Sequence, residues 1–137
     1  MNNNESSKPK ILIVEDDRSS QELFKLLLEK NYEVSICEGE KKFFSLIENS
    51  KADLIIMDIS LRGDKNGIEL IKYLRNDCPK YRTTPIICYS AHVFSQDQSN
   101  ALNAGANIFL AKPVKNEVLL ECIDSTLQDA EKIATLN

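Results

Sequence analysis

Apolar residues follow two alternating patterns along the chain. Short apolar runs lie at 11–14, 54–57, 85–89 and 107–111, with a weaker one at 32–37. Each run is followed by a longer segment in which apolar residues recur every three to four positions. Runs that are apolar at nearly every position are typical of strands covered by helices on both faces. Five such strands, each followed by a helix, predict a parallel α/β sheet.

The first predicted helix has an apolar face and residues that are typical of a helix N-terminus. Phe24 and Leu28 are spaced to lie on one side of it, and Ser19 and Glu22 have the spacing of a capping box. Asp17 precedes these residues and is expected to be a turn residue or a helix cap, because a carboxylate is favourable at the positive end of a helix. We therefore expect the helix to begin directly after the acidic residues that follow the first strand.

Later segments set the extent of the domain. A polar helix is predicted over 95–104, and Gly105 suits a left-handed position after its last turn. The last helix is expected to end near residue 130. We expect a disordered polar tail at 1–8, a single domain at 9–130 and a C-terminal tail at 131–137.

Composition excludes several classes of protein. With 137 residues, 42% of them hydrophobic and 28% charged, the chain has the make-up of one soluble globular domain. A formal charge of −4 gives no attraction for nucleic acid or anionic lipid. No segment approaches the ~20 apolar residues of a membrane span, and the N-terminus lacks a signal peptide. We expect a cytoplasmic protein that binds neither nucleic acid nor membrane.

The four cysteines are far apart and lack the C-x-x-C spacing of metal or redox motifs. They are Cys37, Cys78, Cys88 and Cys122. A free cysteine packs as a small apolar residue. All four are therefore expected to be reduced thiols with no catalytic role.

Polar residues follow four of the five predicted strands. Glu15 and Asp16 come after the first strand, Asp58 after the third, Ser90 after the fourth and Lys112 after the fifth. In an open parallel sheet, ligands bind outside the carboxyl ends of the strands, where the strand order reverses. We therefore expect three carboxylates, one hydroxyl and one amine to converge at one edge of the sheet.

These side chains suit phosphoryl chemistry. Neighbouring carboxylates repel one another and are tolerated mainly around a cation, and hard oxygen ligands favour Mg²⁺. Lys112 and Ser90 would hold a second, anionic group. A Mg²⁺ site, a lysine and a hydroxyl around a carboxylate are the parts that stabilise a phosphoryl group in transfer. Asp58 would be the nucleophile and would form an aspartyl phosphate.

Four motifs in order resemble those of the response regulator receiver family. They are Ile-Leu-Ile-Val-Glu-Asp-Asp at 11–17, Leu-Ile-Ile-Met-Asp-Ile at 54–59 with Asn-Gly-Ile-Glu-Leu at 66–70, Tyr-Ser-Ala at 89–91, and Ala-Lys-Pro at 111–113. Each motif alone is weak, but together they are specific, and the similarity spans about residues 9–130. The resemblance implies a doubly wound, flavodoxin-like (βα)5 fold with strand order 2-1-3-4-5.

The resemblance also implies a ligand set for Mg²⁺. Glu15 and Asp16 would hold the ion, one directly and the other partly through water. Asp58 would bind it as well, and the backbone carbonyl of Ser60 would supply a further oxygen.

Phosphoryl binding and switching are assigned in the same way. Asp58 would carry the phosphoryl group, Ser90 and Lys112 would bind its oxygens, and the peptide bond from Lys112 to Pro113 would be cis. Ser90 would move toward the phosphoryl group, and Phe109 would rotate inward. The surface reshaped by this switch would consist of the fourth helix, the fifth strand and the fifth helix.

The resemblance implies a stand-alone response regulator or phosphorelay receiver. The phosphoryl donor would be a histidine kinase or a histidine phosphotransfer protein, and the output would be contact with a downstream protein through the reshaped surface. Such a protein is not an enzyme for a separate substrate, although it catalyses its own phosphorylation and dephosphorylation. We expect a monomer or a weak dimer.

Other functions remain as alternatives. A phosphatase resembling the haloacid dehalogenases is disfavoured, because here the acidic pair comes first and the lysine last. A flavodoxin-like flavin binder is disfavoured, because the loop after the first strand is acidic where phosphate binding needs Gly, Ser or Thr. A receiver-like scaffold that is never phosphorylated, and a receiver fragment of a hybrid histidine kinase, stay open. The single histidine, His92, makes no site by itself.

Overall fold

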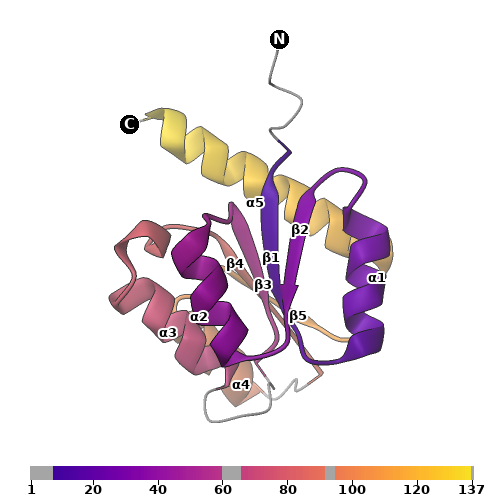
Figure 1. Ribbon diagram of the computed structural model, residues 1–137, viewed down its shortest axis with the longest axis horizontal. Coiled ribbons are helices and arrows are strands. Elements are labelled where there is room, and N and C mark those ends of the chain that lie inside the picture. Colours follow the sequence, from indigo (N-terminus) through magenta and orange to yellow (C-terminus); the bar gives the residue numbers. More distant parts are fainter. Residues whose placement is uncertain (1–7, 60–65, 92–94, 137) are drawn as a thin grey trace.

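The computed structural model describes residues 8–59, 66–91 and 95–136 (Figure 1). Its centre is one sheet of five parallel strands in the order β2-β1-β3-β4-β5. The strands are β1 (Lys10–Val14), β2 (Glu33–Cys37), β3 (Leu54–Met57), β4 (Ile86–Ser90) and β5 (Ile108–Ala111). The predicted fold class and strand order are confirmed.

Helices cover both faces of the sheet (Figure 1). They are α1 (Arg18–Leu28), α2 (Glu40–Asn49), α3 (Gly67–Asn76), α4 (Ser95–Ala104) and α5 (Asn116–Leu136), with a short 3₁₀ helix, η2 (Pro79–Tyr81). Residues of α2, α3 and α4 pack in one apolar cluster, and residues of α1 and α5 pack in another. None of these helices, within the part of the chain that is described, is long and apolar enough to span a bilayer.

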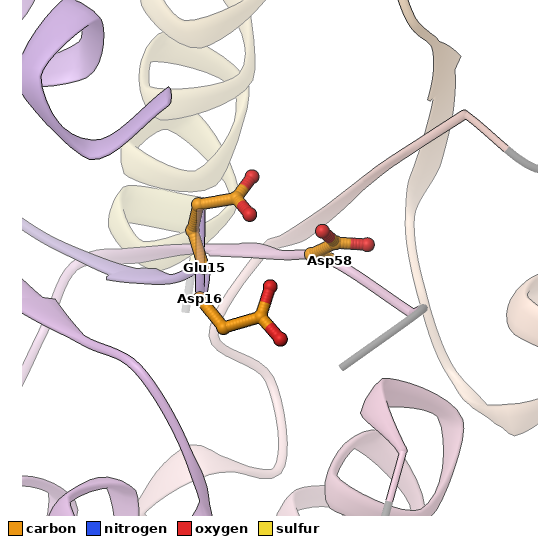
Figure 2. Close-up of side chains that lie close together, drawn as sticks. All are labelled: Glu15, Asp16 and Asp58. Atoms are coloured by element: carbon orange, nitrogen blue, oxygen red, sulfur yellow. The ribbon is translucent and has the colours of Figure 1, made fainter. Parts of the chain in front are cut away.

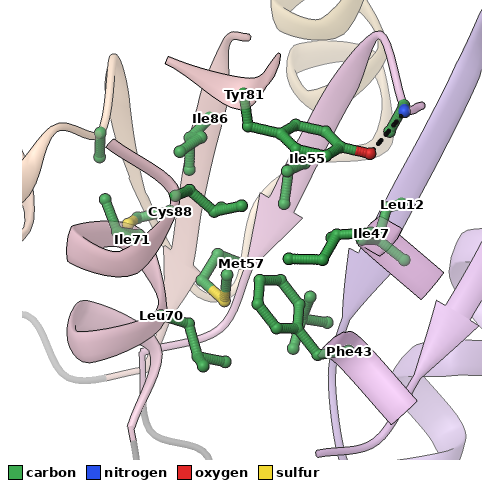
Figure 3. Packing of buried hydrophobic residues seen from close by; sticks show 14 of the residues in the cluster. Leu12, Phe43, Ile47, Ile55, Met57, Leu70, Ile71, Tyr81, Ile86 and Cys88 are labelled. Carbon is green, nitrogen blue, oxygen red and sulfur yellow. Dashed lines mark hydrogen bonds between the residues drawn. The ribbon is translucent and has the colours of Figure 1, made fainter. Parts of the chain in front are cut away.

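Most of the strands are apolar at nearly every position because helices cover both faces of the sheet. In β1, Leu12 and Val14 join the cluster on the α2–α3 side, whereas Ile11 and Ile13 join the cluster on the α1–α5 side. Figure 3 shows the first cluster, where Phe43 of α2 lies against the sheet. Because side chains alternate between the faces of a strand, a sheet buried on both faces needs an apolar residue at nearly every position.

The start of α1 differs from the prediction. Asp17 is the N-cap residue, and its carboxylate accepts a hydrogen bond of 2.9 Å from the backbone N–H of Ser20. The cap expected for Asp17 is confirmed, but the capping box of Ser19 and Glu22 is wrong. Ser19 already lies in the first turn of the helix, so the N–H three residues further on, which a capping box would need, is bonded within the helix.

The last helix is longer than predicted. It continues to Leu136 instead of ending near residue 130, so residues 131–136 are helical and not an irregular tail. No Gly or Pro interrupts this segment. Leu127 and Ala130 remain half-buried, which anchors the helix as far as its last turns, whereas Ile133 is exposed.

Candidate functional site

The paired ends of β1 and β3 bring three carboxylates together. Val14 and Met57 are register partners, so the residues that follow them leave the sheet side by side. Glu15 and Asp16 follow β1, and Asp58 follows β3 with its backbone N–H bonded to the carbonyl of Val14 at 3.0 Å. One oxygen from each of the three carboxylates lies within 4.8 Å of the others (Figure 2). We call Glu15, Asp16 and Asp58 the acidic cluster.

The acidic cluster is largely withdrawn from water. Glu15 and Asp58 are only 1% and 4% exposed, and Asp16 is half-buried. Burial raises the pKa of Glu15, and the charge of Asp58 adds to this increase. The backbone N–H of Asp17, 3.0 Å from the Glu15 carboxylate, opposes the increase, as does Lys112. The raised pKa shows that the pocket disfavours a further negative charge.

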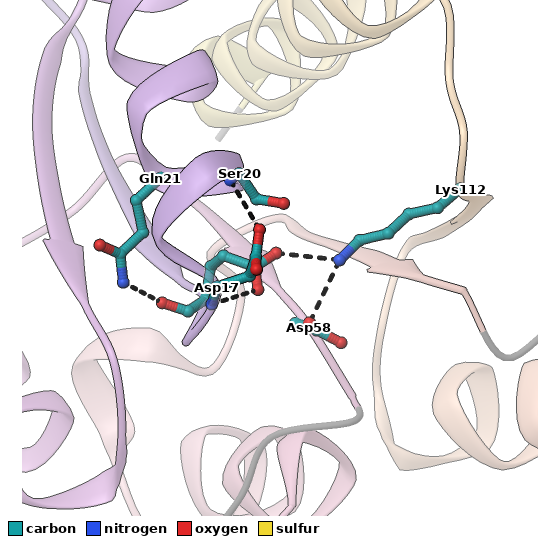
Figure 4. Close-up of polar contacts among 6 residues, drawn as sticks. Asp17, Ser20, Gln21, Asp58 and Lys112 are labelled. Carbon is teal, nitrogen blue, oxygen red and sulfur yellow. Dashed lines mark hydrogen bonds and ion pairs between the residues drawn. The ribbon is translucent and has the colours of Figure 1, made fainter.

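Lys112 bridges two members of the acidic cluster. Its ammonium Nζ lies 3.0 Å from Oε1 of Glu15 and 3.3 Å from Oδ2 of Asp58 (Figure 4). Burial lowers the pKa of Lys112, but the hydrogen bond to Glu15 and the charges of Asp58 and Glu15 outweigh it, so the pKa is raised. Lys112 therefore stays a cation at neutral pH.

The donor set fits a hard divalent cation. One ammonium cannot neutralise three carboxylates, and the oxygens of these carboxylates are close enough together to share one ion. Mg²⁺ and Ca²⁺ prefer oxygen ligands of this kind. An oxygen-only cluster with no histidine or cysteine is a poor match for the softer transition metals.

The ends of β4 and β5 complete the same edge of the sheet. Ser90, the last residue of β4, is fully buried, and its carbonyl accepts a hydrogen bond of 2.9 Å from the backbone N–H of Lys112. The peptide bond between Lys112 and Pro113 is cis, as expected. The structure thus brings the acidic cluster and Lys112 into contact and places Ser90 on the neighbouring strand.

Three other residues were considered from the sequence: Phe109, Ser60 and His92. Phe109 is half-buried on β5, beside Cys88 of β4, and packs on the cluster that covers the α2–α4 face. Its rotation stays a prediction. Ser60 and His92 lie outside the described residues, so the metal contact expected from the backbone of Ser60 stays a prediction as well.

Sequence reasoning missed three residues around the site. Gln21 donates a 2.6 Å hydrogen bond from its side chain to the carbonyl of Glu15, which fixes the loop between β1 and α1 (Figure 4). Gly67 begins α3 so close to the backbone of Asp58 that a side chain there would clash. The ring of Tyr89 lies under the ammonium of Lys112, 4.9 Å from it. Gly67 and Tyr89 lay within two of the four motifs but had no role assigned to them. Gln21 had no sequence signal, because its contact depends on three-dimensional packing.

The fold and the site define a doubly wound α/β protein with an acidic cluster at the carboxyl edge of its sheet. The chain belongs to the response regulator receiver family, because the family model described as the response regulator receiver domain matches residues 11–124. The resemblance inferred from the four motifs is confirmed, and the chain is a receiver-domain protein of two-component signalling.

Individual relatives agree with this assignment. The polar-differentiation response regulator DivK of Brucella anthropi is 31% identical over 121 residues, which cover 88% of this chain and 97% of that protein. A CheY-like response regulator receiver domain protein from Methanospirillum hungatei is 33% identical, with a TM-score of 0.83 over 92% of this chain and 98% of the other. A two-component response regulator from Clostridium difficile is 30% identical, with a TM-score of 0.80 over 88% and 96% of the two chains.

Proposed function

We propose that this protein is a phosphoacceptor response regulator that receives a phosphoryl group on the carboxylate of Asp58. One observation carries the proposal. Asp58 is a buried carboxylate that has two further carboxylates on one side and the ammonium of Lys112 at 3.3 Å. A carboxylate in this setting suits a phosphoryl group, because a phosphoryl group is anionic and needs cations around it during transfer.

The acidic cluster would hold Mg²⁺. Glu15, Asp16 and Asp58 offer the oxygens, and the backbone carbonyl of Ser60, outside the described residues, is the further ligand that we propose. When bound, the ion neutralises negative charge on the phosphoryl oxygens.

The remaining work falls to side chains of the chain itself. An oxygen of Asp58 attacks the phosphorus of a phosphohistidine whose other ring nitrogen is protonated. The new O–P bond forms as the N–P bond breaks, the electron pair of that bond stays on nitrogen, and the donor leaves as neutral imidazole. Lys112 is placed to bind a phosphoryl oxygen, because its ammonium already reaches Asp58. The hydroxyl of Ser90 would bind another oxygen.

We propose that the partners are those of a signalling relay. The donor would be a histidine kinase or a histidine phosphotransfer protein, and the phosphoryl group would later be lost by self-catalysed hydrolysis. Movement of Ser90 and Phe109 would reshape the α4–β5–α5 surface for a downstream protein. The similarity to the Brucella relative, a polar-differentiation response regulator, supports a regulatory role of this type.

The test is direct phosphorylation. Purified protein is mixed with acetyl phosphate or phosphoramidate, with and without Mg²⁺, and the intact mass is measured. We expect one added phosphoryl group that requires Mg²⁺ and is absent from Asp58→Asn. Asp129→Asn, which changes an exposed aspartate of α5, is the matched control and should be phosphorylated normally. A folded wild-type protein that gains no phosphoryl group from either donor would contradict the proposal and leave a receiver-like scaffold.

A further inference from the structure

Lys112 is held by a third group besides its two carboxylate partners. The ammonium lies over the ring of Tyr89, 4.9 Å from the ring centroid. Tyr89 belongs to β4 and pairs in register with Leu110 of β5, two residues before Lys112. The hydrogen bond from the backbone of Lys112 to Ser90 keeps the two strand ends together. The lysine stem therefore leaves the sheet beside this aromatic ring on its way to Asp58.

The ring of Tyr89 is a fixed surface. Phe24 of α1, which is 3% exposed, packs against it edge to face, with ring centroids 5.3 Å apart and an angle of 72° between the planes. Tyr89 itself is half-buried and packs on the apolar cluster of the α1–α5 side. A ring held in this way presents one face to Lys112 with little freedom to turn away.

A fixed ring matters because lysine is flexible. Its four-carbon stem has many rotamers, and its ammonium is a point charge without the planar arrangement of donors that orients an arginine side chain. Glu15 and Asp58 hold the ammonium here, but both carboxylates are also the candidate ligands for a divalent cation. The negative face of an aromatic ring attracts an ammonium without competing for that cation.

We propose that Tyr89 is a positioning residue for phosphoryl transfer: its ring keeps the ammonium of Lys112 within reach of Asp58 when a metal ion occupies the acidic cluster. This inference rests on the proposed function and adds a residue to it. The ring acts through Lys112 and touches neither the phosphoryl group nor the metal.

The test compares two substitutions of Tyr89. Tyr89→Phe keeps the ring and removes the hydroxyl, whereas Tyr89→Leu removes the ring and keeps an apolar side chain. We expect phosphorylation by phosphoramidate at saturating Mg²⁺ to be about fivefold slower in Tyr89→Leu, and to stay near the wild-type rate in Tyr89→Phe. The phenylalanine variant separates the ring from the hydroxyl, and the NMR measurement below separates the contact with Lys112 from a general effect of packing.

A spectroscopic measurement makes the test independent of phosphorylation. A ring beneath the ammonium shifts the NMR signals of the Lys112 ε-methylene protons upfield. We expect this shift in the wild type and in Tyr89→Phe, with and without Mg²⁺, and its loss in Tyr89→Leu. If Tyr89→Leu does not fold, the wild-type spectrum alone decides, because a Lys112 signal without the upfield shift in Mg²⁺ would overturn the inference.

The outcomes distinguish the inference from the function on which it rests. Equal phosphorylation rates in the wild type and Tyr89→Leu would overturn the role of the ring and leave the phosphoacceptor function intact. Equal slowing in both variants would also overturn it, because the hydroxyl and not the ring would then matter. A wild-type protein that accepts no phosphoryl group at all would contradict the proposed phosphoacceptor function, and the positioning role of Tyr89 would fall with it.

Discussion

At the scale of single residues, burial decides which of the four thiols can react. Cys37 and Cys88 are fully buried in the core that α2, α3 and α4 cover. Burial raises the pKa of each to about 12, and the charges of Glu38 near Cys37 and Asp58 near Cys88 act in the same direction. The thiolate, which is the reactive form, is therefore nearly absent from both at pH 8.

We expect an alkylating reagent at pH 8 to leave Cys37 and Cys88 unmodified in the folded protein, with labelling confined to the half-buried Cys78 and Cys122. Burial also raises the pKa of Cys122, so Cys122 should react slowly. Intact mass and peptide mapping after timed labelling measure this. In denaturant all four should react, which is the control, and fast labelling of Cys88 in the native protein would contradict the expectation.

Glu15 gives a prediction about stability and pH. Its raised pKa means that the folded state holds this proton more tightly than the unfolded state does. The stabilisation from this group is therefore fully present below the ordinary carboxyl pKa and is lost as the pH rises through the raised value. Without divalent cations, we therefore expect the negative charge of Glu15 to lower the stability of the fold at pH values above its raised pKa.

We expect Glu15→Gln to increase the free energy of unfolding of the metal-free protein at pH 7 by about 1 kcal/mol, because position 15 then carries no buried charge. The gain should shrink as the pH falls toward 4, where Glu15 is protonated in the wild type. Urea unfolding in the presence of a chelator measures both values, and Asp129→Asn is the control on an exposed carboxylate. A variant that is less stable than the wild type at pH 7 would show that the contacts of Glu15 with Lys112 and Asp17 outweigh its burial.

At the scale of elements, Arg75 ties the end of α3 to two loops. Its guanidinium donates to the carbonyls of Tyr81, Arg82 and Gly105 at 2.8, 3.1 and 3.0 Å, and to the side-chain oxygen of Asn107 at 3.0 Å. Gly105 has a φ of 128°, a conformation that L side chains rarely adopt, and a side chain there would also meet Arg75. The planar guanidinium of Arg75 therefore joins α3, η2 and the turn between α4 and β5.

We expect Arg75→Ala to lower the free energy of unfolding by about 2 kcal/mol, because four acceptors lose their donor at once and two of these hydrogen bonds are partly buried. Arg75→Lys should recover only a small part of this loss, since a single ammonium cannot reach all of the acceptors that surround the planar guanidinium. Chemical denaturation of the three proteins measures the differences. Full recovery by lysine would show that charge alone, and not the planar guanidinium, provides the stability.

The elements also show where sequence reasoning succeeds. The strands were predicted because a sheet covered on both faces forces apolar residues into continuous runs, and Leu54–Met57 matched its prediction at both ends. The helix predicted over 95–104 also matched at both ends. The start of α1 and the end of α5 were predicted less well, since they depend on which side chain reaches a free N–H and on how far a neighbouring surface continues. The 3₁₀ helix Pro79–Tyr81 was not predicted. The Tyr81 hydroxyl donates to the carbonyl of Ser50 and accepts from the backbone N–H of Ala52, and contacts with such a distant segment leave no local sequence pattern.

At the scale of the whole molecule, topology explains why the site was largely predictable. In a parallel sheet, residues that follow different strands meet at one edge, so acidic and basic residues at those positions indicate a site before any coordinates exist. Glu15, Asp16, Asp58 and Lys112 were found in this way and do lie together. The contact between Lys112 and Tyr89 was not, because it depends on the path of a flexible side chain that no sequence pattern specifies.

The same topology predicts coupling between cation binding and stability. If the acidic cluster holds Mg²⁺, the ion stabilises the folded state only, by about 2.7 kcal/mol at a concentration one hundred times its Kd. We expect the thermal midpoint of the wild type to rise with added Mg²⁺. Asp16→Asn should lose most of this increase, because Asp16 contributes one of the three clustered carboxylates, whereas Asp129→Asn should keep it.

Glu15→Gln makes this measurement decisive, since opposite effects are expected from one substitution. Without Mg²⁺ the variant should be more stable than the wild type, because a buried charge is gone; with saturating Mg²⁺ the order should reverse, because a ligand is gone as well. A cation held by Glu15, directly or through water, produces such a crossing, whereas screening of surface charge would stabilise both proteins alike. Parallel stability curves for the two proteins across a Mg²⁺ titration would therefore contradict the role of Glu15 as a ligand in the acidic cluster.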